Sequence, residues 1–211
     1  MNVLVVKANN RPDGISTRMY DTFLEQIEEN QDLNITTYDL FEEDMPYFGQ
    51  DLFSAIGKQQ EGVELNDTEA RLLQAKQKAK DLVAQADTIV LAFPLWNFTV
   101  PAKMQTFIDY LAEAGFSFRY TPEGQHQPLL TDKRVIMLNA RGGNYSAPEM
   151  QPVEMAVNYV RNIFGMHFGM DIKKEVVIEG HNADPNAAET IINEGLEEVK
   201  KTAQTLAYQN A

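Results

Sequence analysis

The sequence of 211 residues contains no cysteine. This absence excludes disulfide bonds, thiolate metal sites, iron–sulfur clusters and a cysteine nucleophile. The fold must therefore be stabilised by its hydrophobic core, and a chain of this length buries enough surface to do so without covalent cross-links.

Positively charged residues are scarce. The chain has 18 Lys and Arg against 31 Asp and Glu, a formal net charge of −13. Nucleic acids and anionic membranes are bound through clustered cations. We therefore expect no nucleic acid and no membrane as a partner, and any bound phosphate must be held by local geometry.

Long apolar runs are also missing. No stretch approaches the length that spans a membrane. The apolar run at residues 3–6 is too short for a signal peptide and has no basic segment before it. We expect a soluble, cytoplasmic protein.

Several short functional motifs are absent. The sequence contains no G-x-G-x-x-G, no G-x-x-x-x-G-K-[ST], no H-E-x-x-H and no G-x-S-x-G. These absences disfavour an enzyme of nucleoside triphosphates, a zinc protease and a serine hydrolase. His126, His167 and His181 are far apart in the sequence and are expected on the surface or in loops, so no metal site is predicted.

Apolar runs alternate with amphipathic stretches from the first residue onward. Buried strands are expected at residues 3–6, 35–40, 88–93, 134–138 and 175–179. Helical spacing of apolar residues follows each strand, at residues 19–27, 68–86, 101–111, 153–164 and 188–206. This alternation predicts an α/β fold: a doubly wound, five-stranded parallel sheet with helices on both faces, in one domain over residues 1–211. Residues 41–65 and 114–131 are expected to form long loops that are functional or cover a partner.

Ligands of such sheets bind at the carboxyl ends of the strands, where the strand order reverses. The connection after the first strand brings Asn9, Ser16 and Thr17 to the start of a helix, with Arg11 or Arg18 nearby. The amino terminus of a helix can bind phosphate through its free N–H groups, even in an acidic protein. Taken alone, however, Ser16 or Thr17 is better explained as an N-cap.

Two further connections have unusual composition. After the third strand, Pro94 and Pro101 flank a segment that contains Trp96 and Phe98. This rigid aromatic turn suits the edge of a flat heteroaromatic ring, and equally suits an aromatic plug on the sheet. Adjacent glycines at residues 142–143 follow the fourth strand and allow close approach of a ligand, or simply form a turn. Together, at neighbouring strand ends, the three connections favour a ligand site.

The same segments carry a resemblance to a known family. They read Pro94-Leu95-Trp96-Asn97-Phe98, Phe118-Arg119-Tyr120-Thr121-Pro122-Glu123-Gly124 and Ala140-Arg141-Gly142-Gly143-Asn144-Tyr145. The spacing of the first two is the most specific part. The chain resembles the FMN-dependent NADH-azoreductases, also described as NADH:quinone oxidoreductases, which have a flavodoxin-like fold.

The resemblance implies a bound FMN and the residues that hold it. Asn9, Ile15, Ser16 and Thr17 would bind the phosphate and the ribityl chain. The ring would lie beside these residues of the other two segments: Pro94, Leu95, Trp96, Asn97, Phe98, Ala140, Arg141, Gly142 and Gly143. Phe118 and Tyr120 would lie near the substrate. Family members are homodimers with the flavin at the subunit interface.

The resemblance also implies an oxidoreductase that transfers two electrons from NADH through FMN to quinones or aromatic azo compounds. Such a reaction follows a ping-pong scheme and requires no acid or base from the protein. The sequence shows no arginine cluster for a 2′-phosphate, which favours NADH over NADPH. The alternatives are a flavodoxin-type electron carrier and a regulator of the same fold without a cofactor. The bulky segments 94–101 and 114–131 favour an enzyme with a substrate pocket.

Overall fold

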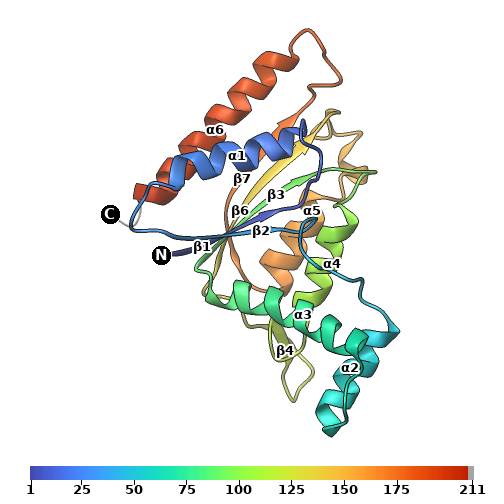
Figure 1. Ribbon diagram of the computed structural model, residues 1–211. Helices are drawn as coiled ribbons and strands as arrows, with labels where there is room; N and C mark the ends of the chain where they lie inside the picture. The colour runs from blue at the N-terminus through green and yellow to red at the C-terminus, as the bar shows by residue number, and fades with distance from the viewer. Residues whose placement is uncertain (209–211) are drawn as a thin grey trace.

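The computed structural model describes residues 1–208. Its centre is a five-stranded parallel sheet in the order β2-β1-β3-β6-β7 (Figure 1). The strands are β1 Asn2–Lys7, β2 Asn34–Asp39, β3 Thr88–Pro94, β6 Arg134–Arg141 and β7 Asp171–Glu179. The predicted fold class, a flavodoxin-like doubly wound sheet, is confirmed.

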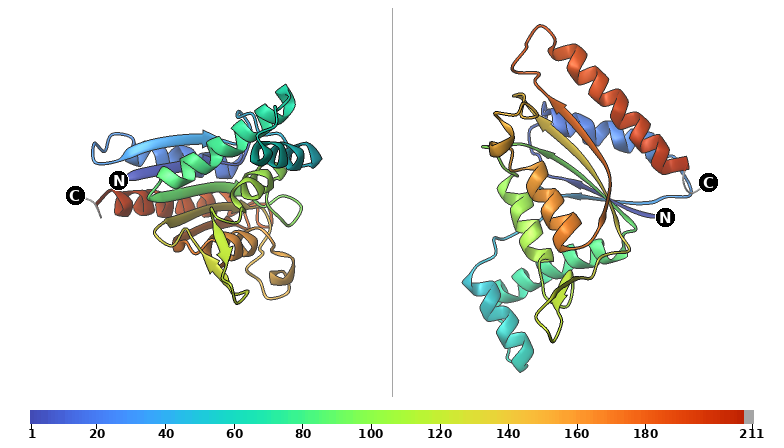
Figure 2. Two further views of the ribbon diagram at one scale, coloured as in Figure 1. Left: turned by 90° about the horizontal axis from the view of Figure 1, so that it is seen from below. Right: turned by 180° about the vertical axis from the view of Figure 1, so that it is seen from behind.

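Helices cover both faces of this sheet. On one face lie α1 Ile15–Ile27 and α6 Ala188–Tyr208 (Figures 1 and 2). On the other face lie α3 Asp67–Gln85, α4 Ala102–Leu111 and α5 Val157–Val160, which continues as a π-helix over Arg161–His167. Within residues 1–208, none of the helices combines the length and the hydrophobicity that crossing a membrane requires.

Strand β3 shows why the sequence forms this architecture. All seven of its residues are buried. Ile89, Leu91 and Phe93 pack into the core beneath α3 and α4, whereas Val90 and Ala92 pack into the core beneath α1 and α6. Because successive side chains of a strand point to opposite faces, a continuous apolar run is what a sheet covered on both sides requires.

The strand order creates one switch point. Strand β1 pairs with β2 on one side and with β3 on the other. From β1 the chain passes through α1 to β2 on one side. It then returns through α3, on the opposite face of the sheet, to β3 on the other side of β1. A crevice forms at the carboxyl ends of β1 and β3, where ligands of doubly wound sheets bind.

Two segments that we expected to be loops contain regular structure. Residues 41–65 include the helix α2 Gln50–Glu61, which buries only Leu52 and Ala55 and so has a weak periodic signal in the sequence. Residues 114–131 include an antiparallel hairpin of β4 Phe118–Tyr120 and β5 His126–Pro128. Each hairpin strand has three residues, too few for an alternating pattern to stand out.

Two predicted boundaries are also wrong. The last strand begins at Asp171, four residues before the predicted start. Its first half lies at an edge of the sheet and consists mainly of charged residues, so it has no apolar run. The predicted helix at 153–164 begins only at Val157, since Val153 lies in a separate turn of 3-10 helix, Gln151–Val153.

Candidate functional site

A cavity of about 400 Å³ opens at the carboxyl ends of the central strands. Its volume is within the range of small-molecule and cofactor sites. Its lining includes these residues of the three connections: Asn9, Arg11, Asp13, Gly14, Ile15, Ser16, Pro94, Leu95, Trp96, Ala140, Arg141 and Gly142. The rest of the lining comes from His181, Asn182, Ala188 and Ile192. The fold thus brings together segments that are up to about 180 residues apart in the sequence, as parallel strands ending at one edge do.

The amino terminus of α1 forms one wall of the cavity. Its N-cap residue is Gly14, which has no side chain to cap the helix, and the first turn contains no acidic residue. The hydroxyl of Ser16 instead accepts a hydrogen bond from Asn9 Nδ2 at 2.8 Å, and Thr17 Oγ1 donates to Arg11 O at 2.9 Å. The N-cap interpretation of Ser16 and Thr17 is therefore wrong. The positive end of the helix dipole faces the cavity, and the nearby carboxylate of Asp13 is paired with Arg11.

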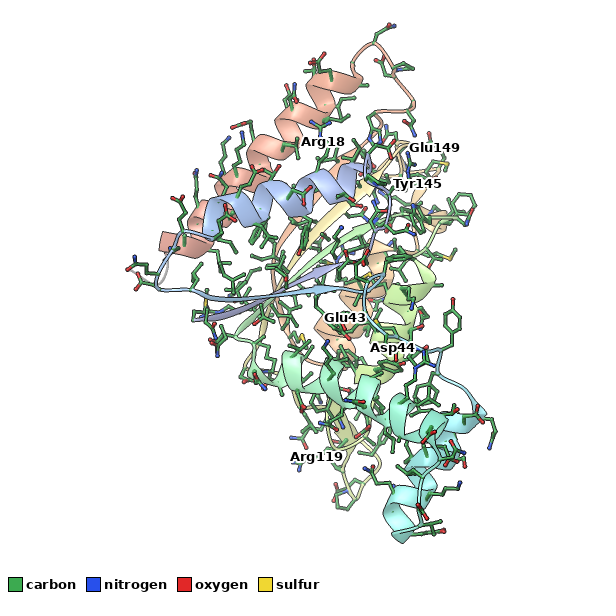
Figure 3. All side chains as sticks on the ribbon, in the orientation of Figure 1. Arg18, Glu43, Asp44, Arg119, Tyr145 and Glu149 are labelled. Carbon is green, nitrogen blue, oxygen red and sulfur yellow. The ribbon has the colours of Figure 1, made fainter. Side chains whose placement is uncertain are left out.

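Asn9 organises this first connection. It is buried, and besides its bond to Ser16 its Oδ1 accepts from Arg11 N at 3.0 Å. A Cβ at Gly14 would lie 2.3 Å from Asn9 Nδ2, so the packing requires glycine there. Arg11 pairs with Asp13 at the surface, and Arg18 lies on α1 outside the cavity lining (Figure 3).

The second connection contains a strained turn. Trp96 and Thr99 exchange two backbone hydrogen bonds, of 2.9 and 3.0 Å, around Asn97 and Phe98. These two residues have φ values of 48° and 71°, the left-handed region that glycine usually occupies. Such backbone costs about 1–3 kcal/mol per residue and is found mainly at functional sites.

The aromatic residues of this turn are not buried as a plug of the sheet. Phe98 is 44% exposed and meets Tyr145 edge-on, with ring centroids 6.2 Å apart. Trp96 is half-buried beside Phe41 and lines the cavity. Asn97 and Phe98 themselves lie outside the cavity lining.

The third connection is held by a buried group of charges. Arg141 is only 6% exposed; its Nη1 lies 3.4 Å from Glu154 Oε1 and its Nε donates to Glu179 Oε2 at 2.8 Å. Glu179 Oε2 also accepts from the backbone N–H groups of Tyr145 and Ser146. Burial would raise the pKa of Glu179, but hydrogen bonds from Ser146 and the charge of Arg141 outweigh it, so this pKa lies below its usual value.

Glu154 extends the same network to the next helix. It is 5% exposed and accepts from the backbone N–H groups of Ala156 and Val157, at 3.1 and 2.9 Å. The guanidinium of Arg141 is thus engaged by two carboxylates, which positions the backbone of the connection. We did not foresee Glu154 or Glu179. Their position beside a helix start and at a strand end was the only signal in the sequence.

A fourth connection, after β7, was not among the segments that we assigned to the site from the sequence. Asn182 N donates to Gly142 O at 2.9 Å, and Gly180 N donates to Gly143 O at 3.2 Å. A Cβ at Gly142 would lie 2.2 Å from Asn182 Nδ2. This connection supports the glycine pair and adds His181 to the cavity wall. Its link to the site follows from the strand order, in which β7 lies beside β6.

Four other predicted residues do not line the cavity within this chain: Thr17, Gly143, Phe118 and Tyr120. Thr17 and Gly143 lie next to residues that do. Phe118 and Tyr120 are on the β4–β5 hairpin, where Phe118 contacts His167 with ring centroids 4.4 Å apart and Tyr120 is 62% exposed. The hairpin leads into the amino end of β6, whereas the cavity lies at its carboxyl end.

Figure 3 shows this separation. Arg119, on the hairpin, lies far from Tyr145, which follows the glycine pair; in Figures 1 and 2 the hairpin likewise lies away from the carboxyl ends of the strands. Within residues 1–208, no group of three His, Asp or Glu side chains has the arrangement of a metal site. The geometry therefore suits an anionic group at the start of α1 together with a polar ligand that extends along the strand ends.

Comparison with known proteins identifies close relatives. The family model described as "Flavodoxin-like fold" matches residues 1–203. An FMN-dependent NADH:quinone oxidoreductase 1 of Bacillus cereus is 45% identical over 204 residues, which is 95% of this chain and 97% of that protein. A Bacillus anthracis azoreductase structure is 43% identical, with a TM-score of 0.87 over 97% of this chain and 99% of that one. A Bacillus anthracis FMN-dependent NADH-azoreductase in complex with FMN is 26% identical, with a TM-score of 0.87 and coverage of 98% and 99%.

Proposed function

The chain belongs to the flavodoxin-like family that includes the FMN-dependent NADH:quinone oxidoreductases, and we propose from this membership that it is such an enzyme. It uses NADH to reduce quinones and aromatic azo compounds. The relatives that match nearly its whole length are named as enzymes, so the alternative of a small electron carrier is not retained. The observation in the fold that carries the proposal is the uncapped amino terminus of α1, which opens into the cavity.

The residues around the cavity fit FMN. The start of α1 suits a phosphate, and Ser16 has a hydroxyl proton left to donate, because its oxygen accepts from Asn9. The hydroxyl of Thr17 already donates its hydrogen bond to Arg11 O, so we assign the phosphate contact to Ser16. We assign the flavin ring to Leu95, Trp96, Asn97 and Phe98 on one side. The other side of the ring we assign to Ala140, Arg141, Gly142 and Gly143.

When bound, FMN would supply the redox chemistry, which is hydride acceptance from NADH and two-electron reduction of the acceptor. The chain's own task is to hold, orient and shield the reacting molecules. The backbone of residues 140–143 is fixed by Arg141 and by the connection after β7, so its N–H groups are preorganised for a developing negative charge. No side chain needs to transfer a proton.

The first test is the visible spectrum of the purified protein titrated with FMN. We expect binding of about one FMN per chain, as one cavity of this kind implies. NADH added without an acceptor should then bleach the flavin absorbance in stopped-flow mixing, and menadione should restore it with steady turnover. A protein that takes up no FMN would overturn the proposed function. A flavin that NADH does not bleach would overturn NADH as the donor.

We further propose a homodimer in which each subunit completes its partner's site. Phe118 and Tyr120 are remote from the cavity of their own chain, so they can approach a substrate only in a second copy. The exposed aromatic side chains of Phe98 and Tyr47 support contact with a partner. The chain is proposed to act as a single domain in the cytoplasm, without nucleic acid or membrane.

A mixing experiment tests the homodimer and the hairpin together. Tyr120→Ala should impair substrate turnover, and Gly142→Val should abolish FMN binding. When the two variants are refolded together, half of the dimers are mixed and each contains one complete site, so we expect about a quarter of wild-type activity. If Tyr120 acts in its own chain, mixing will restore nothing. Sedimentation of each variant alone checks that both still dimerise.

A further inference from the structure

His181 lies in the cavity wall and has an unpaired buried nitrogen. The residue lines the cavity, and its Nδ1 is buried without a hydrogen-bond partner among residues 1–208. The one other buried side-chain atom in that state within the described residues is Asn139 Oδ1, on the strand that leads to the same cavity. Buried polar atoms of native proteins are nearly always paired, so an exception needs an explanation. A bound molecule that supplies the missing partner is such an explanation.

The other two histidines do not share this environment. His126 and His167 stack on each other, with centroids 4.7 Å apart, and both pack against Phe118 on the hairpin. They are remote from the cavity, so the unpaired nitrogen is a property of one position and not of histidines in this chain.

The backbone holds His181 firmly beside the glycine pair. The residue before it, Gly180, donates to Gly143 O at 3.2 Å, and the residue after it, Asn182, donates to Gly142 O at 2.9 Å. Gly180 has a φ of 83°, which allows the chain to turn there. Ala183 N and Asp184 N both donate back to Gly180 O and close the turn. Since both neighbours are fixed, the backbone of His181 has a defined position relative to residues 140–143.

The protonation of this imidazole also suits a ligand contact. Burial lowers the pKa of His181, which keeps the ring neutral near pH 7. A neutral imidazole has one nitrogen that donates and one that accepts, so Nδ1 can pair with a hydroxyl, a carbonyl or an N–H group. The charged side chains of the cavity are already paired: Arg11 with Asp13, and Arg141 with two carboxylates.

We propose that His181 is a further cofactor-holding residue, whose Nδ1 makes a hydrogen bond to the ribityl chain or the ring edge of the flavin and not to its phosphate. This inference rests on the proposed function. The phosphate belongs at the start of α1, whereas His181 is attached to the connection that we assign to the ring. The contact is made by a side chain on a fourth connection, in addition to the three that the sequence indicates.

Substitutions that mimic one ring nitrogen at a time provide the test. Asparagine places an amide group where Nδ1 lies, glutamine places one where Nε2 lies, and leucine provides neither. We expect His181→Leu and His181→Gln to bind FMN about 10- to 100-fold more weakly, and His181→Asn to stay within about threefold of wild type. Fluorescence quenching of FMN measures all four dissociation constants. Asn186→Leu, an exposed residue of the same connection outside the cavity lining, is the control and should bind as wild type does.

Binding of riboflavin shows which part of the cofactor His181 contacts. Riboflavin lacks the phosphate of FMN, so His181→Leu should weaken the binding of riboflavin and of FMN by the same factor. A loss confined to FMN would overturn the assignment to the ring or the ribityl chain. Equal FMN affinity in wild type and His181→Leu would overturn the inference itself, and failure of the wild type to bind FMN would overturn the proposed function instead.

The stability of the apoprotein separates this role from a structural one. Leucine removes an unpaired buried nitrogen, so apo His181→Leu should melt at the wild-type temperature or above it. A residue that merely supports the fold would lower the melting temperature when replaced. A lower melting temperature with unchanged FMN affinity would therefore contradict a ligand contact at His181.

Discussion

Arg141→Met is expected to lower the free energy of unfolding by about 3–5 kcal/mol, because it leaves two carboxylates in a buried site without their cation. Glu154 is 5% exposed, and the side chain of Glu179 is 20% exposed. Both keep hydrogen bonds from backbone N–H groups, but these do not neutralise charge. Urea unfolding at pH 7 measures the loss.

Arg161→Met is a matched control for this experiment. Arg161 also forms a two-point ion pair with a glutamate, donating to Glu175 at 2.8 and 2.7 Å, but its side chain is 46% exposed. Exposed pairs contribute little, so we expect a loss of less than about 1 kcal/mol. Similar losses in the two variants would show that burial of the Arg141 network has no special importance.

The pH dependence gives the same experiment a second readout. The pKa of Glu179 is lowered in the folded protein, so its favourable pairing is present above the usual carboxyl range and disappears as the pH falls and the group is protonated. The stability difference between wild type and Arg141→Met should therefore narrow from pH 7 toward pH 3. A difference that is constant over this range would point to lost packing and not to lost charge.

Gly142→Val is expected to weaken FMN binding by at least about 100-fold, the loss of roughly two hydrogen bonds, while the fold is retained. A Cβ at this position would lie 2.2 Å from Asn182 Nδ2 and 2.8 Å from Asn182 Cγ. Asn182 is exposed and can move outward, which is why the fold should survive. The backbone that faces the cavity moves with it, because Asn182 N donates to Gly142 O. FMN titration together with a thermal melt measures both effects.

Two further variants show whether crowding is the cause. Gly57 lies in α2, and a Cβ there would have no neighbour within 4 Å, so Gly57→Val should leave FMN binding unchanged. Adding Asn182→Gly to Gly142→Val removes the obstructing side chain and should restore part of the affinity. If Gly142→Val alone binds FMN as wild type does, Gly142 is not part of the site.

The sequence predicts those strands and helices in which many side chains are buried. Strand β3 is buried at every position because both faces of the sheet are covered, and its apolar run is evident in the sequence. Helix α2 rests on two buried residues, Leu52 and Ala55, and its pattern is lost among polar neighbours. What makes an element visible is thus the number of buried positions it contributes.

Only part of the candidate site could be predicted from local sequence. The three connections around the cavity are recognisable because each has an unusual local composition. The pairing of Arg141 with Glu179, and of Asn182 with Gly142, joins residues about 40 apart in the sequence. Such contacts depend on which strands become neighbours, so no local pattern reveals them. His181 looks like any loop histidine until the fold places the residue in the cavity wall with a buried, unpaired Nδ1.

The turn at Asn97 and Phe98 has a consequence for how this protein can change over generations. A glycine at position 98 would adopt the observed φ of 71° without strain, so selection for heat resistance alone would favour replacing the phenylalanine. Selection for catalysis would oppose that exchange if the exposed ring serves the reaction or the partner. Populations of this gene evolved under the two regimes should therefore separate at this codon before they separate in the core.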